Sequence, residues 1–234
     1  MSLLETNNLS ANYGLFQALF SINLRVEDGE AVALIGSNGA GKTTLLKSIA
    51  GDLLSYGNAV SLEGTAVGKL PAYVRVSKGI SLVPEGRRLF SSLTVEENLL
   101  LGQSSKRPGP WTLARVYDVF PVLYQVRRNM ATALSGGQQQ LVAIARALMG
   151  NPRLLLCDEI SLGLSPVASN QVHDALKVVL DEGVAVLLVE QNIQKALKTS
   201  TRFYCMRKGE IVLNGNSATA DLDEITREYF GVYA

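Results

Sequence analysis

The first third of the chain alternates apolar and polar residues, a pattern that predicts β-structure. Ile22, Leu24 and Val26 occupy every second position, which is the period of a strand with one buried face. Asp28-Gly29 then predicts a hairpin turn, and Ala31–Ile35 is a continuous apolar run typical of a fully buried strand. We therefore expect an antiparallel β region near the start of the chain.

Helical periodicity dominates the middle of the chain. A helix is predicted over Thr43–Ala50, and a buried strand over Ile80–Val83. The segment from about Thr94 to Met149 has mainly helical spacing, interrupted by the Gly-, Ser- and Pro-rich stretch Gly102–Pro110. We expect a separate helical lobe here, spanning about residues 90–149.

Two further buried strands are predicted over Arg153–Cys157 and Val184–Val189. The helix between them carries apolar residues at helical spacing: Val172, Ala175, Leu176 and Val179. Strands that alternate with helices are typical of a mainly parallel sheet. Together these patterns predict an α/β fold.

The last predicted strands form a hairpin. Phe203–Met206 and Ile211–Leu213 flank a turn at Lys208-Gly209, and a short polar helix follows over Leu222–Tyr229. No repeats or low-complexity tracts divide the sequence, so we expect residues 1–234 to form a single domain.

Composition narrows the possible functions. The 22 Lys and Arg residues nearly balance the 21 Asp and Glu residues, and the net charge of +1 argues against a general nucleic-acid binder. The longest apolar runs, such as Val184–Val189, are too short to span a bilayer, and the N-terminus lacks the pattern of a secretory signal. Cys157 and Cys205 lie in apolar runs and are expected to be buried thiols in a reducing compartment. We therefore expect a cytoplasmic protein, with any membrane part supplied by another subunit.

A glycine-rich loop carries the first chemical signal. Gly36-Ser-Asn-Gly-Ala-Gly-Lys42-Thr43 matches G-x-x-x-x-G-K-[ST], follows a predicted strand and begins a predicted helix. Glycines let backbone N–H groups surround a phosphate, and the helix N-terminus adds free amide donors. Lys42 supplies a cation for the β- and γ-phosphates, and the Thr43 hydroxyl is a ligand for Mg²⁺. The loop therefore predicts a phosphate-binding site.

Two carboxylates follow the next buried strand. Asp158 and Glu159 come directly after the apolar run that ends at Cys157. Charges at the end of a buried strand are costly unless they meet a cation or hydrogen-bond donors, and parallel α/β sheets bind ligands at this end of their strands. Asp158 is expected to reach the Mg²⁺ shell, and Glu159 to polarise the water that attacks the γ-phosphate. An acidic pair that merely caps the next turn is the alternative.

A second anion-binding loop is predicted before a clear helix. In Leu134-Ser-Gly-Gly-Gln138, Ser135 is a good N-cap, and Gly136 and Gly137 leave the first amides of the helix unobstructed. Taken alone, the segment fits a well-capped helix with no ligand equally well.

In this order, the phosphate loop, Leu134–Gln138 and Asp158-Glu159 resemble the hallmark motifs of the ATP-binding subunits of ABC transporters. The resemblance covers nearly the whole chain and implies a P-loop NTPase core with a helical subdomain. It implies that ATP and Mg²⁺ bind, and that two such domains pair head to tail, with the Ser135 loop of one closing over ATP held by the other. The residues that it assigns to nucleotide contacts are Tyr13, Gly36, Ser37, Asn38, Gly39, Ala40, Gly41, Lys42, Thr43, Thr44, Ser135, Gly136, Gly137 and Gln138. Tyr13 would stack on adenine, although by itself it also fits a surface position of a strand.

Four positions depart from the family pattern. Ile160 stands where a Pro is usual and Ser165 where an Asp is usual, whereas Glu85 replaces a Gln and Gln191 replaces a switch His. We expect Glu85 to help hold Mg²⁺ and Gln191 to position the γ-phosphate as a fixed dipole. The one histidine, His173, is expected to be a solvated or half-buried helix residue.

The segments Val83–Arg88 and Val189–Asn192 resemble one subgroup, the smaller ATPase of importers for branched-chain amino acids and of related urea and short-amide importers. The resemblance implies an ATPase that binds membrane permease subunits on the inner face of the membrane. It also implies that this ATPase pairs with a second copy or with a sister ATPase, and that a periplasmic binding protein takes part indirectly. Three other classes stay open: a non-transport ATPase of the superfamily, a small-molecule P-loop kinase and an ATP-binding module without turnover. The lack of long insertions argues against a non-transport ATPase, and the Leu134–Gln138 motif argues against a kinase. Glu159 argues against a module without turnover.

Overall fold

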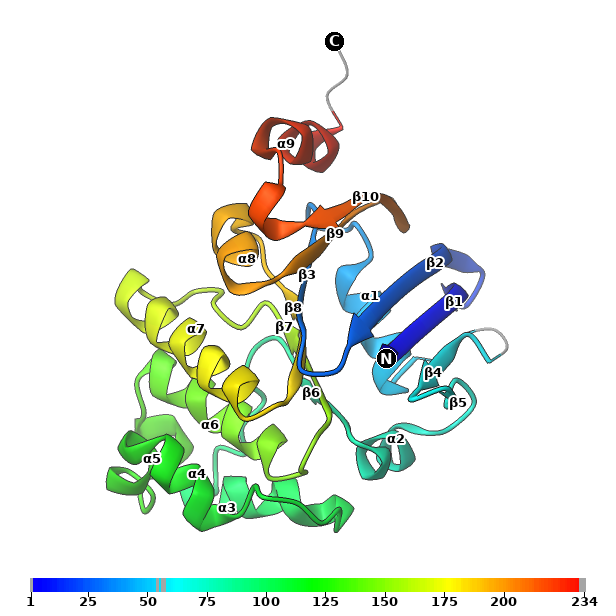
Figure 1. Cartoon of the computed structure of the whole chain (residues 1–234). Coiled ribbons are helices and arrows are strands. Elements are labelled where there is room, and N and C mark those ends of the chain that lie inside the picture. The colour runs from blue at the N-terminus through cyan, green and yellow to red at the C-terminus, as the bar shows by residue number, and fades with distance from the viewer. Residues whose placement is uncertain (1, 54, 56–57, 232–234) are drawn as a thin grey trace.

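A computed structural model describes residues 2–53, 55 and 58–231, which fold into two β-sheets flanked by helices (Figure 1). The smaller sheet is antiparallel, in the order β2-β1-β4-β5. Its strands are β1 Ser2–Tyr13, β2 Phe16–Glu27, β4 Val60–Leu62 and β5 Thr65–Ala66. As predicted, Ile22, Leu24 and Val26 of β2 are buried and alternate with exposed residues, so β2 has one face in the core.

The larger sheet has the order β10-β9-β3-β8-β7-β6. Its strands are β3 Ala31–Ile35, β6 Ile80–Val83, β7 Leu154–Asp158, β8 Ala185–Val189, β9 Arg202–Arg207 and β10 Glu210–Asn216. Neighbours from β9 to β6 are parallel, and β10 pairs antiparallel with β9 through the predicted hairpin. The predicted mainly parallel α/β sheet is confirmed.

Helices cover this sheet and form a group beyond its β6 edge. In Figure 1, the helices from α3 to α6 lie together at the end of the molecule opposite α9. The α-helices are α1 Lys42–Ala50, α2 Ala72–Lys78, α3 Val95–Leu101, α4 Leu113–Val119, α5 Pro121–Gln125, α6 Gly136–Leu148, α7 Pro166–Asp181, α8 Ile193–Thr199 and α9 Leu222–Phe230. Short 3₁₀ turns lie at Gly102–Ser105, Ala131–Ala133 and Ser217–Thr219. Among the described residues, no helix has both the length and the apolar character needed to cross a bilayer.

The large sheet separates two main hydrophobic clusters. Leu156 and Leu187 belong to the cluster shared with α1 and the antiparallel sheet. Their neighbours Leu155 and Leu188 belong to the cluster shared with helices α3 to α7. This alternation follows from the two-residue period of a strand that is buried on both faces. Both cysteines are buried free thiols, as predicted.

The hairpin predicted at Asp28-Gly29 is wrong. The turn is present, but β2 pairs with β1, whereas β3 pairs with β8 and β9 in the other sheet. All five residues of Ala31–Ile35 are buried, so both faces of β3 need apolar partners, which an edge of a half-exposed hairpin does not supply.

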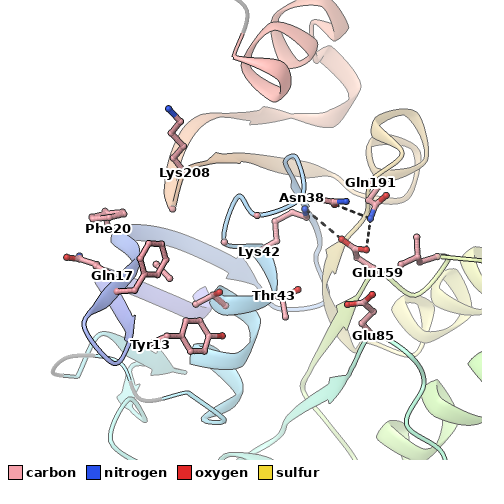
Figure 2. A pocket seen from close by; sticks show the side chains of 17 residues that line it. Tyr13, Gln17, Phe20, Asn38, Lys42, Thr43, Glu85, Glu159, Gln191 and Lys208 are labelled. Carbon is pink, nitrogen blue, oxygen red and sulfur yellow. Dashed lines mark hydrogen bonds and ion pairs between the residues drawn. The ribbon is translucent and has the colours of Figure 1, made fainter.

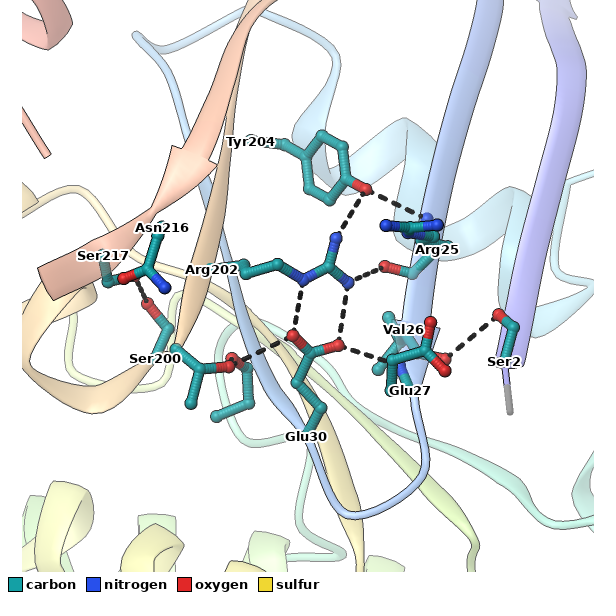
Figure 3. A network of polar contacts seen from close by, with 12 residues as sticks. Ser2, Arg25, Val26, Glu27, Glu30, Ser200, Arg202, Tyr204, Asn216 and Ser217 are labelled. Atoms are coloured by element: carbon teal, nitrogen blue, oxygen red, sulfur yellow. Dashed lines mark hydrogen bonds and ion pairs between the residues drawn. The ribbon is translucent and has the colours of Figure 1, made fainter. Parts of the chain in front are cut away.

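A polar network fixes the two sheets to each other at the start of β3 (Figure 3). Arg202 of β9 donates hydrogen bonds from Nε and Nη2 to the two carboxylate oxygens of Glu30, at 2.6 and 2.8 Å. The same Nη2 donates to the carbonyl of Arg25 in β2 (2.9 Å), and the Tyr204 hydroxyl accepts from the Arg25 N–H (3.2 Å). Because β2 and β9 belong to different sheets, this network orients the antiparallel sheet against the strand that leads to the phosphate loop.

Candidate nucleotide-binding site

The phosphate loop joins β3 to α1, and two of its glycines have no substitute. A Cβ at Gly36 would lie 2.4 Å from the carbonyl oxygen of Met206. Gly41 precedes α1 with φ of 104°, a conformation that strains residues with a side chain. Since Gly41 provides no side-chain cap, the first N–H groups of α1 are suited to an anion.

Lys42 lies beneath this loop, and its side chain is only 5% exposed. Its Nζ donates to the carbonyls of Gly36 (2.7 Å) and Ser37 (3.0 Å) and lies 3.8 Å from Oε1 of Glu159. Burial lowers the pKa of Lys42, and the carboxylates of Glu159 and Asp158 act in the opposite direction. The loop carbonyls therefore orient the cation that the sequence assigns to the phosphates.

Asp158 is the last residue of β7 and is buried beside the phosphate loop. The Thr43 hydroxyl donates to its Oδ1 at 3.1 Å. Burial raises the pKa of Asp158, the Thr43 hydroxyl lowers it, and the nearby carboxylates of Glu159 and Glu85 raise it further. A divalent cation fits here, because it would relieve the repulsion among these carboxylates.

The donor set matches the preferences of Mg²⁺. Among the residues that the structure describes, no three or more His, Cys, Asp or Glu side chains gather into a metal cage. Mg²⁺ is commonly bound by one or two carboxylates, water and substrate phosphate oxygens, rather than by an all-protein cage. Thr43 and Asp158 would be the protein groups nearest to such a cation, and phosphate oxygens and water would supply its other ligands.

Glu159 and Gln191 meet at the carboxyl ends of β7 and β8 (Figure 2). Gln191 donates from Nε2 to Oε2 of Glu159 at 2.6 Å, and to Oδ1 of Asn38 in the phosphate loop at 3.3 Å. Glu159 has φ of 48°, and its N–H donates to the Val189 carbonyl at 3.1 Å. A left-handed conformation at a residue other than glycine costs on the order of 1 kcal/mol and is found most often at functional sites. The carboxylate is thus aimed by both the backbone and the Gln191 amide.

One cavity of about 840 Å³ is lined by Lys42, Thr43, Glu159 and Gln191. Asp158 is not among its lining residues but contacts Thr43, which is, and Gly36, Ser37 and Ala40 also lie outside the lining. Figure 2 shows Tyr13, Gln17 and Phe20 on one side and Glu85, Glu159 and Gln191 on the other, with Lys42 and Thr43 between them. The first side offers exposed aromatic rings, which suit stacking with a base. The cavity therefore has a cationic and acidic half for phosphates and Mg²⁺ and an aromatic half for a ring.

The sequence reading missed part of this aromatic half. Phe16 and Phe20 of β2 line the cavity, as does Lys208 in the β9–β10 turn. Phe16 is 70% exposed and Phe20 is 40% exposed. Two solvent-facing phenylalanines in one strand close to Tyr13 are the signal that could have indicated them.

The Ser135 loop lies outside this cavity. Ser135 caps α6 in a capping box: its Oγ accepts from the Gln138 N–H (3.3 Å), and Oε1 of Gln138 accepts from the Ser135 N–H (3.0 Å). The predicted N-cap is confirmed. A Cβ at Gly137 would lie 3.0 Å from Cβ of Ala168, so this glycine also permits close packing against α7. In a single chain, Ser135 is exposed while Leu134 and Gly137 are buried, and the loop does not line the cavity of the phosphate loop.

Glu85 connects the cavity to α6. It lines the cavity, and the three residues after it, Gly86, Arg87 and Arg88, all have positive φ, at 76°, 63° and 46°. Arg87 donates to Oε1 of Gln139 at 2.9 Å, and Arg146 of α6 donates to the carbonyls of Arg88 (2.9 Å) and Arg87 (3.1 Å). The backbone after Glu85 is therefore held by α6, the helix that Ser135 caps.

Three other residues from the sequence analysis do not line the cavity. Ile160 is buried in the core, and the Ser165 Oγ caps α7 by accepting from the Ala168 N–H at 3.3 Å. The expectation that His173 is solvated or half-buried is wrong, since its side chain is 8% exposed. The cause is α8, which covers the face of α7 that carries His173. The Thr199 hydroxyl of α8 lies 3.1 Å from Nδ1 of His173.

Proteins similar to this chain belong to the family that the order of its motifs indicates. The sequence model of the family described as ABC transporter matches residues 19–161. The chain is 42% identical over 218 residues to the high-affinity branched-chain amino acid transport ATP-binding protein BraG of Pseudomonas aeruginosa, covering 92% of this chain and 94% of that protein. It is 35% identical over 218 residues to the probable branched-chain amino acid transport ATP-binding protein LivF of Archaeoglobus fulgidus, covering 92% of each.

The fold is similar to that of a solved dimeric ATP-binding cassette in a post-hydrolysis state, bound to ADP and phosphate. The TM-score is 0.80 at 25% identity, and the superposition covers 92% of this chain and 98% of that one.

Proposed function

The chain belongs to the ABC transporter family, and we propose that it is the ATP-hydrolysing subunit of an importer for branched-chain amino acids. The choice of solute is supported by the identities of 42% and 35% to proteins named for that transport. The segments Val83–Arg88 and Val189–Asn192 support the same subgroup. A urea or short-amide importer is the alternative that these two segments leave open.

One observation carries the proposed chemistry: the Glu159 carboxylate is oriented by Gln191 at 2.6 Å and lies 3.8 Å from the Lys42 ammonium. The cation that binds the phosphates and the base that activates water are thus adjacent. In hydrolysis, a water oxygen attacks the γ-phosphorus while Glu159 accepts its proton, and the bond from the γ-phosphorus to the β–γ bridging oxygen breaks. The products are ADP and inorganic phosphate.

The remaining contacts are assigned by their position around the cavity. The amides of Gly36–Thr44 and the Lys42 ammonium bind the phosphates, and Tyr13 stacks on adenine with Phe20 beside it. Thr43, Asp158 and Glu85 hold Mg²⁺, directly or through water. When bound, Mg²⁺ neutralises part of the charge on the β- and γ-phosphates. Gln191 contacts the γ-phosphate as a neutral donor.

Turnover needs a second ATPase subunit. The Leu134–Gln138 loop exposes Ser135 at the start of α6 and does not line the cavity of its own chain. We assign it to the γ-phosphate of ATP held by a partner, in a head-to-tail dimer with a second copy or with a sister ATPase. Similarity to a dimeric cassette supports this arrangement.

A groove of about 590 Å³ between β6, α2 and α6 is the proposed docking face for a permease. Phe90 and Leu101 line it and are 55% and 43% exposed, and Arg88 and Arg146 lie among them. This surface suits an apolar segment with acidic flanks, on a cytoplasmic loop of the permease. Since Arg146 also holds the backbone after Glu85, docking at the groove is linked to the cavity. Permease binding would place the subunit on the inner face of the membrane, with a periplasmic binding protein acting from the other side.

Coexpression with the permeases encoded beside its gene tests the proposal. The purified complex, reconstituted with its binding protein, is expected to hydrolyse ATP faster with leucine, isoleucine or valine than without solute. Urea and acetamide serve as comparison solutes. Stimulation by urea or acetamide alone would overturn the choice of solute, and no ATP hydrolysis under any condition would overturn the enzyme assignment.

A further inference from the structure

Glu190 lies between the two segments that carry Glu159 and Gln191. It directly follows β8, its side chain is 5% exposed, and its two carboxylate oxygens accept from the Ser161 hydroxyl at 2.9 and 2.7 Å. The backbone N–H groups of Gln191 and Asn192 donate to its Oε1 at 3.2 and 3.4 Å. Ser161 comes two residues after Glu159 in the chain. One buried carboxylate therefore holds the backbone on both sides of the Glu159–Gln191 contact.

His173 faces this carboxylate from α7. Its Nε2 lies 3.4 Å from Oε2 of Glu190, and its Nδ1 lies 3.1 Å from the Thr199 hydroxyl. An imidazole nitrogen without hydrogen would turn a lone pair toward the carboxylate, so Nε2 must carry a hydrogen. The Thr199 hydroxyl, which donates to the Lys195 carbonyl at 2.9 Å, accepts from Nδ1 when that nitrogen is also protonated. His173 therefore turns its Nε2 hydrogen toward Glu190 in an electrostatic contact that lacks the geometry of a regular hydrogen bond.

The charge at Glu190 depends on these contacts. Burial raises the pKa of Glu190, but the contacts with His173 and Ser161 outweigh it and lower the pKa below its ordinary value. A buried carboxylate that loses a donor is strongly destabilised and turns toward solvent or other donors. Such a turn would release Ser161 and the N–H of Gln191 together.

We propose that His173 is a positioning residue for ATP hydrolysis, which acts through Glu190 to keep Glu159 and Gln191 in contact. The inference rests on the function proposed above. His173 touches neither the cavity nor the phosphate loop, so its effect is expected on the rate of the chemical step and not on nucleotide binding.

The test compares His173→Leu, His173→Gln and a matched control, Lys177→Leu, in the full chain. Lys177 lies one turn further along α7 and is 53% exposed. His173→Leu is expected to lower kcat about 10- to 100-fold with unchanged ATP affinity, because small misplacements of reacting groups have effects of this size. His173→Gln, which keeps an N–H donor at a similar distance along the side chain, is expected to recover most of the rate. Equal rates in His173→Leu and wild type would overturn the proposal, and so would equal losses in the Leu and Gln variants.

Glu190→Gln provides a second measurement if His173→Leu folds poorly. The amide keeps the shape, but its single nitrogen must face either the backbone N–H groups at Oε1 or the His173 N–H at Oε2, so one donor loses its acceptor and kcat is expected to fall. Adding His173→Ala, which removes the N–H donor, to Glu190→Gln is expected to cause no further loss, because both act on one contact. Multiplying losses would show that His173 acts independently and would overturn the proposal. Glu159→Gln is assayed beside them: if it retains activity, the proposed function fails, whereas an inactive Glu159→Gln with normal His173 variants contradicts this inference alone.

Discussion

Gln191 donates a hydrogen bond of 2.6 Å to Glu159, and the two residues lie just beyond the carboxyl ends of adjacent parallel strands. Asp158 and Val189 are paired in register at the ends of β7 and β8, so the residues that follow them meet across the same edge of the sheet. A neutral amide orients the carboxylate without exchanging a proton with it. A histidine in the same place could titrate near neutral pH. The arrangement therefore separates the base from the residue that positions it.

Glu159→Gln is expected to keep ATP binding and to abolish turnover. The amide preserves the shape of the side chain and still accepts from Gln191, but it does not take a proton from water. General bases contribute about 100- to 10,000-fold to rates, so a loss of that size is expected in an assay of released phosphate. ATP should then trap a dimer, visible by size-exclusion chromatography. Glu182→Gln, on the exposed end of α7, serves as the control. Hydrolysis close to the wild-type rate would move the catalytic role to another residue.

Lys42→Ala is expected to weaken ATP binding strongly. The ammonium is buried and already oriented by the carbonyls of Gly36 and Ser37, so no exposed lysine can replace it. The variant loses the contacts of the ammonium with the β- and γ-phosphates. At about 1.5 kcal/mol each, their loss weakens ATP binding by about 100-fold. Titration with a fluorescent ATP analogue measures this loss, and Lys78→Ala on exposed α2 is the control. An affinity within a few-fold of wild type would contradict the phosphate-loop assignment.

The phosphate loop and the acidic pair could be predicted because each depends on local spacing. A strand, six loop residues and a helix start suffice to place Lys42, and Asp158 and Glu159 stand at the end of one apolar strand. The contact between His173 and Glu190 could not be predicted, because it depends on α8 covering one face of α7. The pairing of β3 could not be predicted for the same reason. The Asp28-Gly29 turn is visible in the sequence, but the strands that pair with β3 are far from it along the chain. Helix α2 was missed because its seven residues are too short for a clear apolar period.

Ser135→Arg is expected to leave ATP binding by the single chain unchanged and to block hydrolysis. Ser135 does not line the cavity of its own chain, whereas an arginine would fill the loop that meets the partner's γ-phosphate. Nucleotide affinity at low protein concentration and phosphate release at high concentration separate the two effects. Thr132→Arg, exposed just before the loop, tests whether any added arginine has the same result. Loss of ATP binding in the isolated chain would place the loop in its own subunit's site.

Glu85→Gln is expected to make ATP binding less dependent on Mg²⁺. The Glu85 carboxylate raises the pKa of Asp158, and it would repel a triphosphate unless a cation lies between them. ATP without Mg²⁺ should therefore bind more tightly to the variant than to wild type, and with Mg²⁺ this advantage should disappear or reverse. Isothermal titration with and without Mg²⁺ measures the ratio of affinities. The same ratio in both proteins would remove Glu85 from the Mg²⁺ shell.

Glu30→Gln is expected to destabilise the fold at neutral pH and to have progressively less effect in acid. Burial raises the pKa of Glu30, but the hydrogen bonds and charge of Arg202 lower it below its ordinary value of 4.5. A carboxylate whose folded pKa is depressed stabilises the fold fully above its unfolded pKa, and this contribution is lost as pH falls through the folded value. Hydrogen bonds to charged groups suggest a difference of about 1.5–3 kcal/mol at pH 7 in urea unfolding, shrinking below about pH 4.5. Glu63→Gln, whose side chain is 48% exposed and pairs with Arg153, should change stability by no more than about 1 kcal/mol. If the difference in free energy of unfolding between Glu30→Gln and wild type stays constant from pH 7 to pH 3, the Glu30 charge does not stabilise the junction of the two sheets.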